Sequence, residues 1–199
     1  MKELEKEELI KLFNSTKQNN PDKSLDEILF EAFNKVKENE TDSFENFRNA
    51  ILSANGINEY NYYTKNVDSR IKRYVEGIIF PQYARNDQGH GIIHIKEVIR
   101  RSFALNDTLK LSLDDNLMYT IAACHDWGKF EEVETGEKHA KIAGRRFIND
   151  EVFKDIFNED DRATIKEAIE DHSSSLDDIP RSTYGKLVSS ADRNTRIEI

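Results

Sequence analysis

The sequence has 199 residues, a formal net charge of -9, 37% hydrophobic residues and 34% charged residues, and this length suits one domain with an appendage. A chain this acidic is not expected to bind nucleic acid, because phosphate binding depends on clustered Lys and Arg. With no apolar run near the roughly 18 residues of a membrane helix and no secretory signal at its start, the chain is expected to act in the cytoplasm, away from membranes.

Helical spacing dominates the chain, which contains only eight Gly and three Pro. Residues 1–20 predict a modest helix, residues 21–39 a clear helix capped by Ser24, and residues 42–56 a helix capped by Ser43. These helices form an expected N-terminal helical region, residues 1–62. Residues 57–65 break the periodicity and are interpreted as the connection to a second unit. The expected fold class is therefore all-α, with an N-terminal helical appendage.

The second unit is expected to span residues 66–199 and to be more strongly apolar. Its predicted helices lie near residues 67–80, 91–105, 114–128, 137–149, 160–172 and 181–196. The sequence ends at Ile199, seven residues after Asp192. We expect either a minimal domain or a piece of a longer protein.

All five histidines lie between residues 90 and 172. His172 lies seven residues after Ile165 and continues an apolar helical face, and the same spacing relates His125 to Met118. His94 and Asp192 also fall on apolar faces of their predicted helices, four residues from a valine in each case. Taken alone, each histidine could be an ordinary surface or core residue. Together they predict several helices that each deliver one ligand-type group to the interior.

This pattern is typical of a metal site in the core of a helical bundle. A buried carboxylate is costly without a cation, and imidazole and carboxylate ligands without thiolates favour a catalytic ion such as Mn, Fe, Co, Ni or Zn over a structural zinc. The single cysteine, Cys124, adjoins His125 but points about 100 degrees away from it on a helix. It is interpreted as a packed core thiol.

Three segments in this order, "HIKEV", "AACHDWGK" and "LVSSADRNTR", resemble the HD-domain superfamily of metal-dependent phosphohydrolases. The resemblance covers roughly residues 70–199 and implies the helical bundle of that superfamily. It implies one or two divalent ions (Mn, Fe, Co, Ni, Mg or Zn) with His94, His125, Asp126 and Asp192 as ligands. His139 and His172 fall where the binuclear branch places two further histidines, in which case Asp126 would bridge two ions.

His90 offers an alternative first ligand, because "GHGIIHI" places it four residues before His94. The histidine nearest the "IKEV" segment fits the ligand position better. We therefore assign His94 to the metal and His90 to the substrate pocket, with the reverse assignment left open.

Substrate binding requires cations, and Lys129, four residues after His125, is the first candidate to meet a phosphate oxygen. Arg193, next to the last candidate ligand, is a weaker candidate. The pair Arg145 and Arg146 is also weaker, because two adjacent arginines cannot share a helix face. The aromatic residues after the adjacent His125 and Asp126, which we call the doublet, are Trp127 and Phe130. They could form a wall for a nucleotide base, but this spacing is more typical of core residues.

The sequence therefore predicts a phosphohydrolase with Asp126 and Lys129 in catalytic roles, acting on a phosphomonoester or phosphoanhydride of a small molecule, which we expect to be a nucleotide.

An alternative is a metal- or nucleotide-binding regulatory module without turnover. A third interpretation is a single structural zinc held by the histidines. The alarmone-hydrolysing branch of the superfamily is less expected, because it typically has an acidic pair after the doublet, where this chain has Gly128 and Lys129. The oligomeric state cannot be inferred from the sequence.

Overall fold

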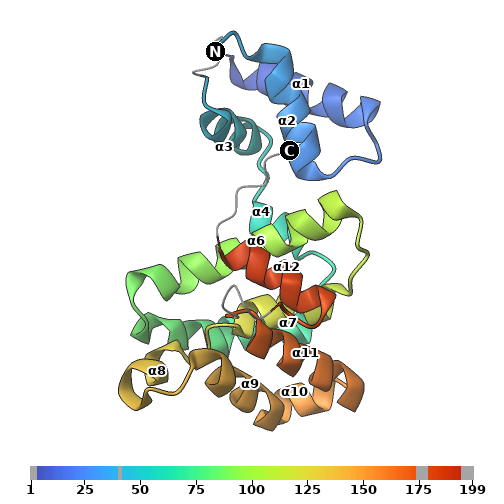
Figure 1. Ribbon diagram of the computed structural model, residues 1–199. Coiled ribbons are helices and arrows are strands. Elements are labelled where there is room, and N and C mark those ends of the chain that lie inside the picture. Colours follow the sequence, from blue (N-terminus) through green and yellow to red (C-terminus); the bar gives the residue numbers. More distant parts are fainter. Residues whose placement is uncertain (1–3, 40–41, 174–178, 194–199) are drawn as a thin grey trace.

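The computed structural model describes residues 4–39, 42–173 and 179–193, and in these residues it contains helices and no β-strand. The all-α fold class is confirmed. Three N-terminal helices form a group at one end of the molecule, and the other helices form a larger bundle (Figure 1). Over the part of the chain that is described, none of the helices has the length and apolar character needed to span a lipid bilayer.

The N-terminal group consists of α1 (Lys6–Asn19), α2 (Leu25–Val36) and α3 (Phe44–Ala54). Both predicted N-caps are present. The hydroxyl of Ser24 accepts the backbone N–H of Glu27 while the Glu27 carboxylate accepts that of Ser24, which forms a capping box. The hydroxyl of Ser43 accepts the backbone N–H of Asn46. These caps and the apolar stripes explain why the three helices form where the sequence predicts them.

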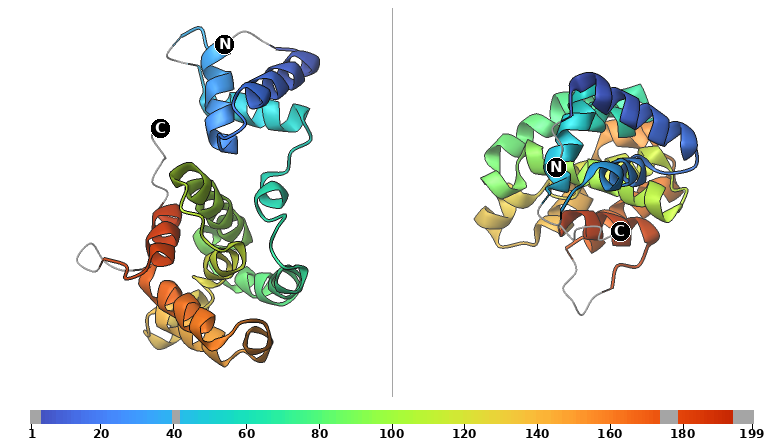
Figure 2. Two further views of the ribbon diagram at one scale, coloured as in Figure 1. Left: turned by 90° about the vertical axis from the view of Figure 1, so that its right-hand side faces the viewer. Right: turned by 90° about the horizontal axis from the view of Figure 1, so that it is seen from above.

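The connection contains a short helix, α4 (Glu59–Tyr63), that the sequence did not predict, because five residues are too few to show a periodic stripe. This helix packs on α6 (Ile92–Leu109), and the buried ring of Tyr63 lies 6.4 Å from that of Phe103. The α2 helix also contacts α6. The N-terminal group thus meets the bundle at one end of α6 (Figure 2).

The helix predicted over residues 67–80 is wrong after Tyr74. α5 (Ser69–Tyr74) continues as a π-helical turn (Val75–Ile79), a 3-10 turn (Phe80–Arg85) and a further 3-10 turn (Gln88–His90). Pro81 has no N–H to continue an α-helical ladder. The irregular path brings the Tyr83 hydroxyl to the carbonyl oxygen of Ala123, 2.8 Å away, so this segment lies against the end of α7 (Asp115–Cys124).

The α7 helix (Asp115–Cys124) lies at the centre of the bundle, and all seven residues of Met118–Cys124 are fully buried. An uncharged run this long has no face for solvent, so other helices surround it. Its neighbours include α6, α11 (Glu159–Asp171) and α12 (Thr183–Asp192). Around them lie α9 (His139–Asn149), which packs on α11, and two helices the sequence missed, α8 (Lys129–Thr135) and α10 (Glu151–Ile156).

The helix predicted over residues 114–128 ends four residues early, at Cys124. The chain then turns tightly, with the Trp127 N–H bonded to the Cys124 carbonyl oxygen and the Lys129 N–H to that of Asp126, each at 3.0 Å. Two other boundaries also differ. α6 continues to Leu109 instead of residue 105, and α12 ends at Asp192 with Arg193 as its C-cap. Residues 194–196 of the predicted helix lie outside the described residues.

Candidate metal centre

The six residues nominated as ligands lie close together between the bundle helices, although they come from five separate places in the chain. They are His94 on the first turn of α6, His125 and Asp126 in the turn after α7, His139 at the start of α9, His172 at the end of α11, and Asp192 at the end of α12. Helix ends and a turn therefore supply all six side chains.

The carboxylate of Asp126 lies at the centre of this cluster. Its Oδ2 atom is 3.6 Å from Nε2 of His94 and 3.3 Å from Nε2 of His125. Its Oδ1 atom is 3.4 Å from Nε2 of His139 and 3.7 Å from Nε2 of His172. The two oxygens of one carboxylate thus face two different pairs of histidines.

Asp192 belongs to only one side of this arrangement. Its Oδ1 atom lies 3.1 Å from Nε2 of His94 and 3.7 Å from Nε2 of His125. We call His94, His125 and Asp192 the first half-site, and His139 with His172 the second half-site, with Asp126 between them. The ligand atoms of the first half-site lie within 4.8 Å of one another, a spacing that a single ion could occupy, and His125, Asp126 and His172 form an overlapping group of the same kind.

Each of three imidazoles is held through Nδ1, so that Nε2 points into the cluster. Nδ1 of His125 lies 2.8 Å from the carbonyl oxygen of Ala122, and Nδ1 of His172 lies 2.6 Å from that of Ile169. An acceptor at this distance favours the tautomer with the proton on Nδ1, which leaves the Nε2 lone pair for a ligand. Metal-binding histidines are commonly oriented in this way.

His139 is held by a carboxylate instead. Its Nδ1 atom lies 3.0 Å from Oε2 of Glu132, and its backbone N–H donates to Oε1 of the same residue at 3.2 Å. Oε2 of Glu132 also accepts a hydrogen bond from Nζ of Lys129 at 2.7 Å. Burial would raise the pKa of Glu132, but these partners outweigh it and lower the pKa to about 2.

The charges of the cluster are strongly coupled. Burial lowers the pKa of His125, but the carboxylates of Asp126 and Asp192 outweigh it and raise the pKa to about 10. Burial likewise raises the pKa of Asp126, and the neighbouring His125 and His172 more than reverse that effect, so the pKa falls well below its usual range. The two carboxylates thus favour positive charge among the imidazoles.

A divalent cation fits this set of donors. Nε2 of His94, Nε2 of His125 and Oδ2 of Asp126 are buried and have no hydrogen-bond partner, which is costly for polar atoms in a core. All three atoms border the first half-site and carry lone pairs once the imidazoles are neutral. A bound cation would satisfy them together and would take the place of the proton that His125 otherwise holds.

The structure places the other nominated residues less centrally. Nδ1 of His90 lies 2.8 Å from Oδ1 of Asp87, and its ring lies 6.0 Å from that of His94, beside the cluster. His90 lies before α6, separated from it by the extended Gly91, so it does not share a helix face with His94. Arg193 follows the end of α12, and its backbone N–H donates to the carbonyl oxygen of Ser189.

Lys129 does not share a helix face with His125, because α7 ends at Cys124 and Lys129 begins a new helix after Gly128. Its ammonium group pairs with Glu132. Cys124 is fully buried as expected, and burial raises the pKa of its thiol well above the ordinary value. It stays outside both groups of candidate ligands among the described residues.

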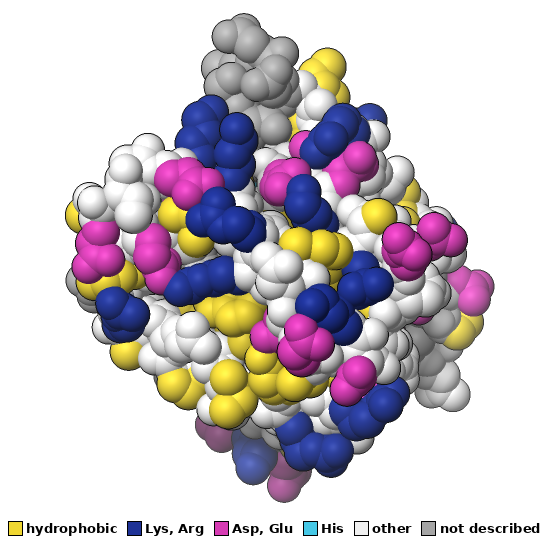
Figure 3. Space-filling view, turned by 90° about the horizontal axis from the view of Figure 1, so that it is seen from below, with side chains coloured by type: hydrophobic (Ala, Val, Ile, Leu, Met, Phe, Trp, Pro, Cys, Tyr) yellow, Lys and Arg dark blue, Asp and Glu magenta, His cyan; other side chains and the backbone are white. Residues whose placement is uncertain are grey.

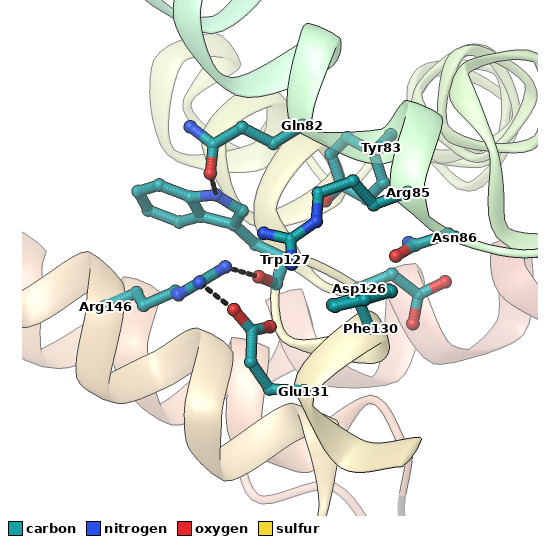
Figure 4. Close-up of a pocket in the computed structure, with 9 residues that line it drawn as sticks. All are labelled: Gln82, Tyr83, Arg85, Asn86, Asp126, Trp127, Phe130, Glu131 and Arg146. Atoms are coloured by element: carbon teal, nitrogen blue, oxygen red, sulfur yellow. Dashed lines mark hydrogen bonds and ion pairs between the residues drawn. The ribbon is translucent and has the colours of Figure 1, made fainter. Parts of the chain in front are cut away.

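A pocket of about 250 Å³ opens beside Asp126 (Figure 4). It contains both aromatic residues of the doublet segment, Trp127 and Phe130, which the sequence left closer to core than to the site. Of the two adjacent arginines only Arg146 reaches it, whereas Arg145 pairs with Glu137 at the surface. The full lining is Gln82, Tyr83, Arg85, Asn86, Asp126, Trp127, Phe130, Glu131 and Arg146.

Six residues near the site were missed by the sequence reasoning: Gln82, Tyr83, Arg85, Asn86, Glu131 and Glu132. Gln82, Arg85 and Asn86 come from the 3-10 turn and the residue after it, where no periodicity indicates a face. Glu132 had a weak signal, because an acidic residue seven positions before a candidate histidine ligand can accept a hydrogen bond from the Nδ1–H of that histidine.

The comparisons with known proteins add one finding. A family model, the HD domain, matches residues 91–197, which is more than half of the chain and includes all six residues of the cluster. Neither the search of curated proteins nor the search of solved structures returned a match. The chain therefore belongs to the HD-domain superfamily, an all-α group of metal-dependent phosphohydrolases that bind divalent metals.

Proposed function

We propose that this protein hydrolyses a phosphomonoester or phosphoanhydride of a small molecule, and that the substrate is a nucleotide. The proposed metal ligands are His94, His125, Asp126, Asp192, His139 and His172. Residues 66–199 form the proposed catalytic unit, and residues 1–62 a separate helical region that contacts it at α6.

The observation that carries this proposal is the division of the Asp126 carboxylate between two pairs of imidazoles. Oδ2 faces His94 and His125 and Oδ1 faces His139 and His172, which supports the proposal that Asp126 would bridge two ions. When bound, divalent ions lower the pKa of water toward neutrality and neutralise developing charge on a phosphate ester. The proposal thus accounts for all six ligand-type residues with one reaction.

The chain's own residues have complementary roles in this proposal. The Nδ1 contacts of His125, His139 and His172 fix the ring orientations. Asp192 supplies the second carboxylate of the first half-site. Asp126 also borders the pocket, so a substrate bound there would place its scissile group next to the ligands.

The proposed substrate contacts are less central than the ligands. We keep His90, beside His94, and Arg193, beside Asp192, as proposed contacts at the edge of the site. For Lys129 we propose an indirect role. Its ammonium group neutralises Glu132, which in turn orients His139, and this pairing limits its availability to a phosphate.

Metal analysis combined with a substrate panel tests the proposal. The purified 199-residue chain loaded with Mn²⁺ is expected to bind up to two equivalents and to release phosphate from at least one nucleotide or phosphomonoester. His172→Ala should lose the second equivalent, and Asp126→Ala should lose both the second equivalent and the activity. His90→Ala is the matched control for His94→Ala, because it removes an imidazole four residues away and should leave the metal content unchanged.

Two results would contradict the proposal in different ways. Metal binding of the expected pattern without turnover of any tested phosphate compound would favour the regulatory module. A single zinc that is tightly held, with closed coordination, would favour a structural role for the histidines.

A further inference from the structure

The pocket beside Asp126 contains two arginines with different surroundings. The guanidinium of Arg146 pairs with Glu131 and donates to the carbonyl oxygen of Trp127, so its charge is balanced within the pocket wall. The indole Nε1–H of Trp127 donates to Oε1 of Gln82 at 2.9 Å, which fixes this wall further. These groups already have partners and shape the pocket.

Arg85 lies on the side of the pocket opposite Arg146 (Figure 4), and its side chain is exposed. Its guanidinium carbon is 3.9 Å from the centroid of the Phe130 ring, which is a close cation–π stack. Over the described ranges no carboxylate pairs with this guanidinium. Figure 4 shows it between Trp127 and Phe130, with Asp126 on the same side of the pocket as Phe130.

Stacking on a ring restrains the plane of a guanidinium and leaves its edge donors free. That edge matches the oxygens of a phosphate, which arginine commonly binds through two parallel hydrogen bonds. The other charges of the pocket are already balanced, since Arg146 is paired with Glu131 and Asp126 faces four imidazoles. Arg85 is therefore the group in the pocket that adds net positive charge.

The mixed charges on the surface outside the pocket indicate that anion binding depends on a group within the pocket. On the face seen from below the bundle, Lys and Arg side chains alternate with Asp and Glu around apolar patches, and the whole chain carries a net charge of -9 (Figure 3). A surface of this kind does not provide a broad positive field to attract an anion. Recognition of an anion at the site thus requires a specific cation.

We propose that Arg85, stacked on Phe130, is the anion-recognition residue of this site and binds the phosphoryl oxygens of a phosphorylated substrate in the pocket beside Asp126. The role of this contact in catalysis rests on the proposed function, whereas phosphate binding itself does not. The pocket is small, so it suits a phosphoryl group and the atoms next to it, with the rest of the substrate outside.

Titration calorimetry with inorganic phosphate tests the proposal on the 199-residue chain, with and without Mn²⁺. Arg85→Gln is expected to weaken phosphate binding roughly tenfold or more, the effect of removing hydrogen bonds from a charged donor. Arg85→Lys, which keeps the charge and loses the planar donor edge, should give an intermediate affinity. Arg73→Gln is the matched control, because Arg73 is exposed on α5 and does not line the pocket, so it should bind phosphate like the wild type.

Phosphate binding by Arg85→Gln with wild-type affinity, or no phosphate binding by the wild-type protein, would overturn the proposal. Circular dichroism of each variant shows whether the fold is retained. If the wild type binds phosphate through Arg85 but hydrolyses no compound of the panel, the proposed function fails and the binding proposal stands. If a substrate is found, Arg85→Gln should raise its KM more than it lowers kcat.

Discussion

Glu132 holds His139 through two contacts, one to the ring and one to the backbone. Its Oε2 atom lies 3.0 Å from Nδ1, and its Oε1 atom accepts the backbone N–H at 3.2 Å. Burial lowers the pKa of His139, and the Glu132 carboxylate counteracts part of that effect. This contact fixes both the tautomer of the ring and the start of α9, so it should determine how well the second half-site binds an ion.

Glu132→Gln is therefore expected to lower metal affinity at the second half-site roughly 10- to 100-fold, the usual effect of losing an outer-shell partner. The first half-site should keep its affinity, since Glu132 contacts none of its ligands. Calorimetric titration with Mn²⁺ would show this as the selective weakening of one of two binding phases. Glu134→Gln, an exposed change on the same helix, is the control. Two unchanged phases in Glu132→Gln would refute the role assigned to this carboxylate.

His94, His125, His172 and Asp192 were predictable because each continues an apolar helical face, and Asp126 adjoins His125, whereas His139 was expected only from the resemblance to the HD-domain superfamily. A histidine seven residues after Ile165 has few places to point except inward, and His172 is indeed buried. The N-caps Ser24 and Ser43 were predictable for a similar reason, because a cap depends only on residues within one helical turn. Such signals are local, and the periodicity of a helix carries them over its whole length.

The pocket could not be predicted, because it depends on contacts between residues 45 positions apart in the chain. Arg85 reaches Phe130, and Gln82 reaches Trp127, only because the chain leaves α-helical geometry after Tyr74 and approaches the end of α7. The early end of α7 was missed because residues 125–129 contain one glycine and no proline. The close approach of α9, which depends on tertiary packing, explains that turn.

Gly128 is the residue of that turn with the least space. A Cβ atom there would lie 2.6 Å from the carbonyl oxygen of His139 and 2.6 Å from Cβ of Ile142, both on α9. Gly128→Ala should therefore push α9 away from the turn and cost about 1–3 kcal/mol in the free energy of unfolding, as overpacking commonly does. Because α9 carries His139, the second half-site should also bind Mn²⁺ more weakly.

Urea unfolding followed by circular dichroism measures the first effect and metal titration the second. Gly77→Ala is the matched control, since a Cβ at Gly77 would have no atom within 4 Å. That variant is expected to be as stable as the wild type or slightly more stable, because alanine reduces the entropy of the unfolded chain. Equal stability of the two variants would show that the turn and α9 can separate without cost.

A buried ion-pair network connects the N-terminal group to the bundle. Nη1 of Arg48 donates to Oε2 of Glu59 at 2.7 Å, and Nη2 lies 3.2 Å from Oδ1 of Asp26. Arg100 on α6 adds a weaker contact, 3.8 Å from Glu59. Burial raises the pKa of Glu59 despite these arginines. Arg48 is thus the cation closest to these two buried carboxylates.

Arg48→Met should cost about 3 kcal/mol in the free energy of unfolding at neutral pH, the lower end of the range for breaking a buried ion pair, because Arg100 remains. Arg70→Met, which breaks a solvent-exposed pair with Asp68, should leave the free energy of unfolding close to the wild-type value. Without Arg48 the pKa of Glu59 in the folded state rises further above its unfolded value, so folding takes up a proton. The penalty should therefore be largest above the folded pKa and shrink as the pH falls below it. A penalty that is independent of pH would indicate lost packing of the arginine side chain instead of unpaired charge.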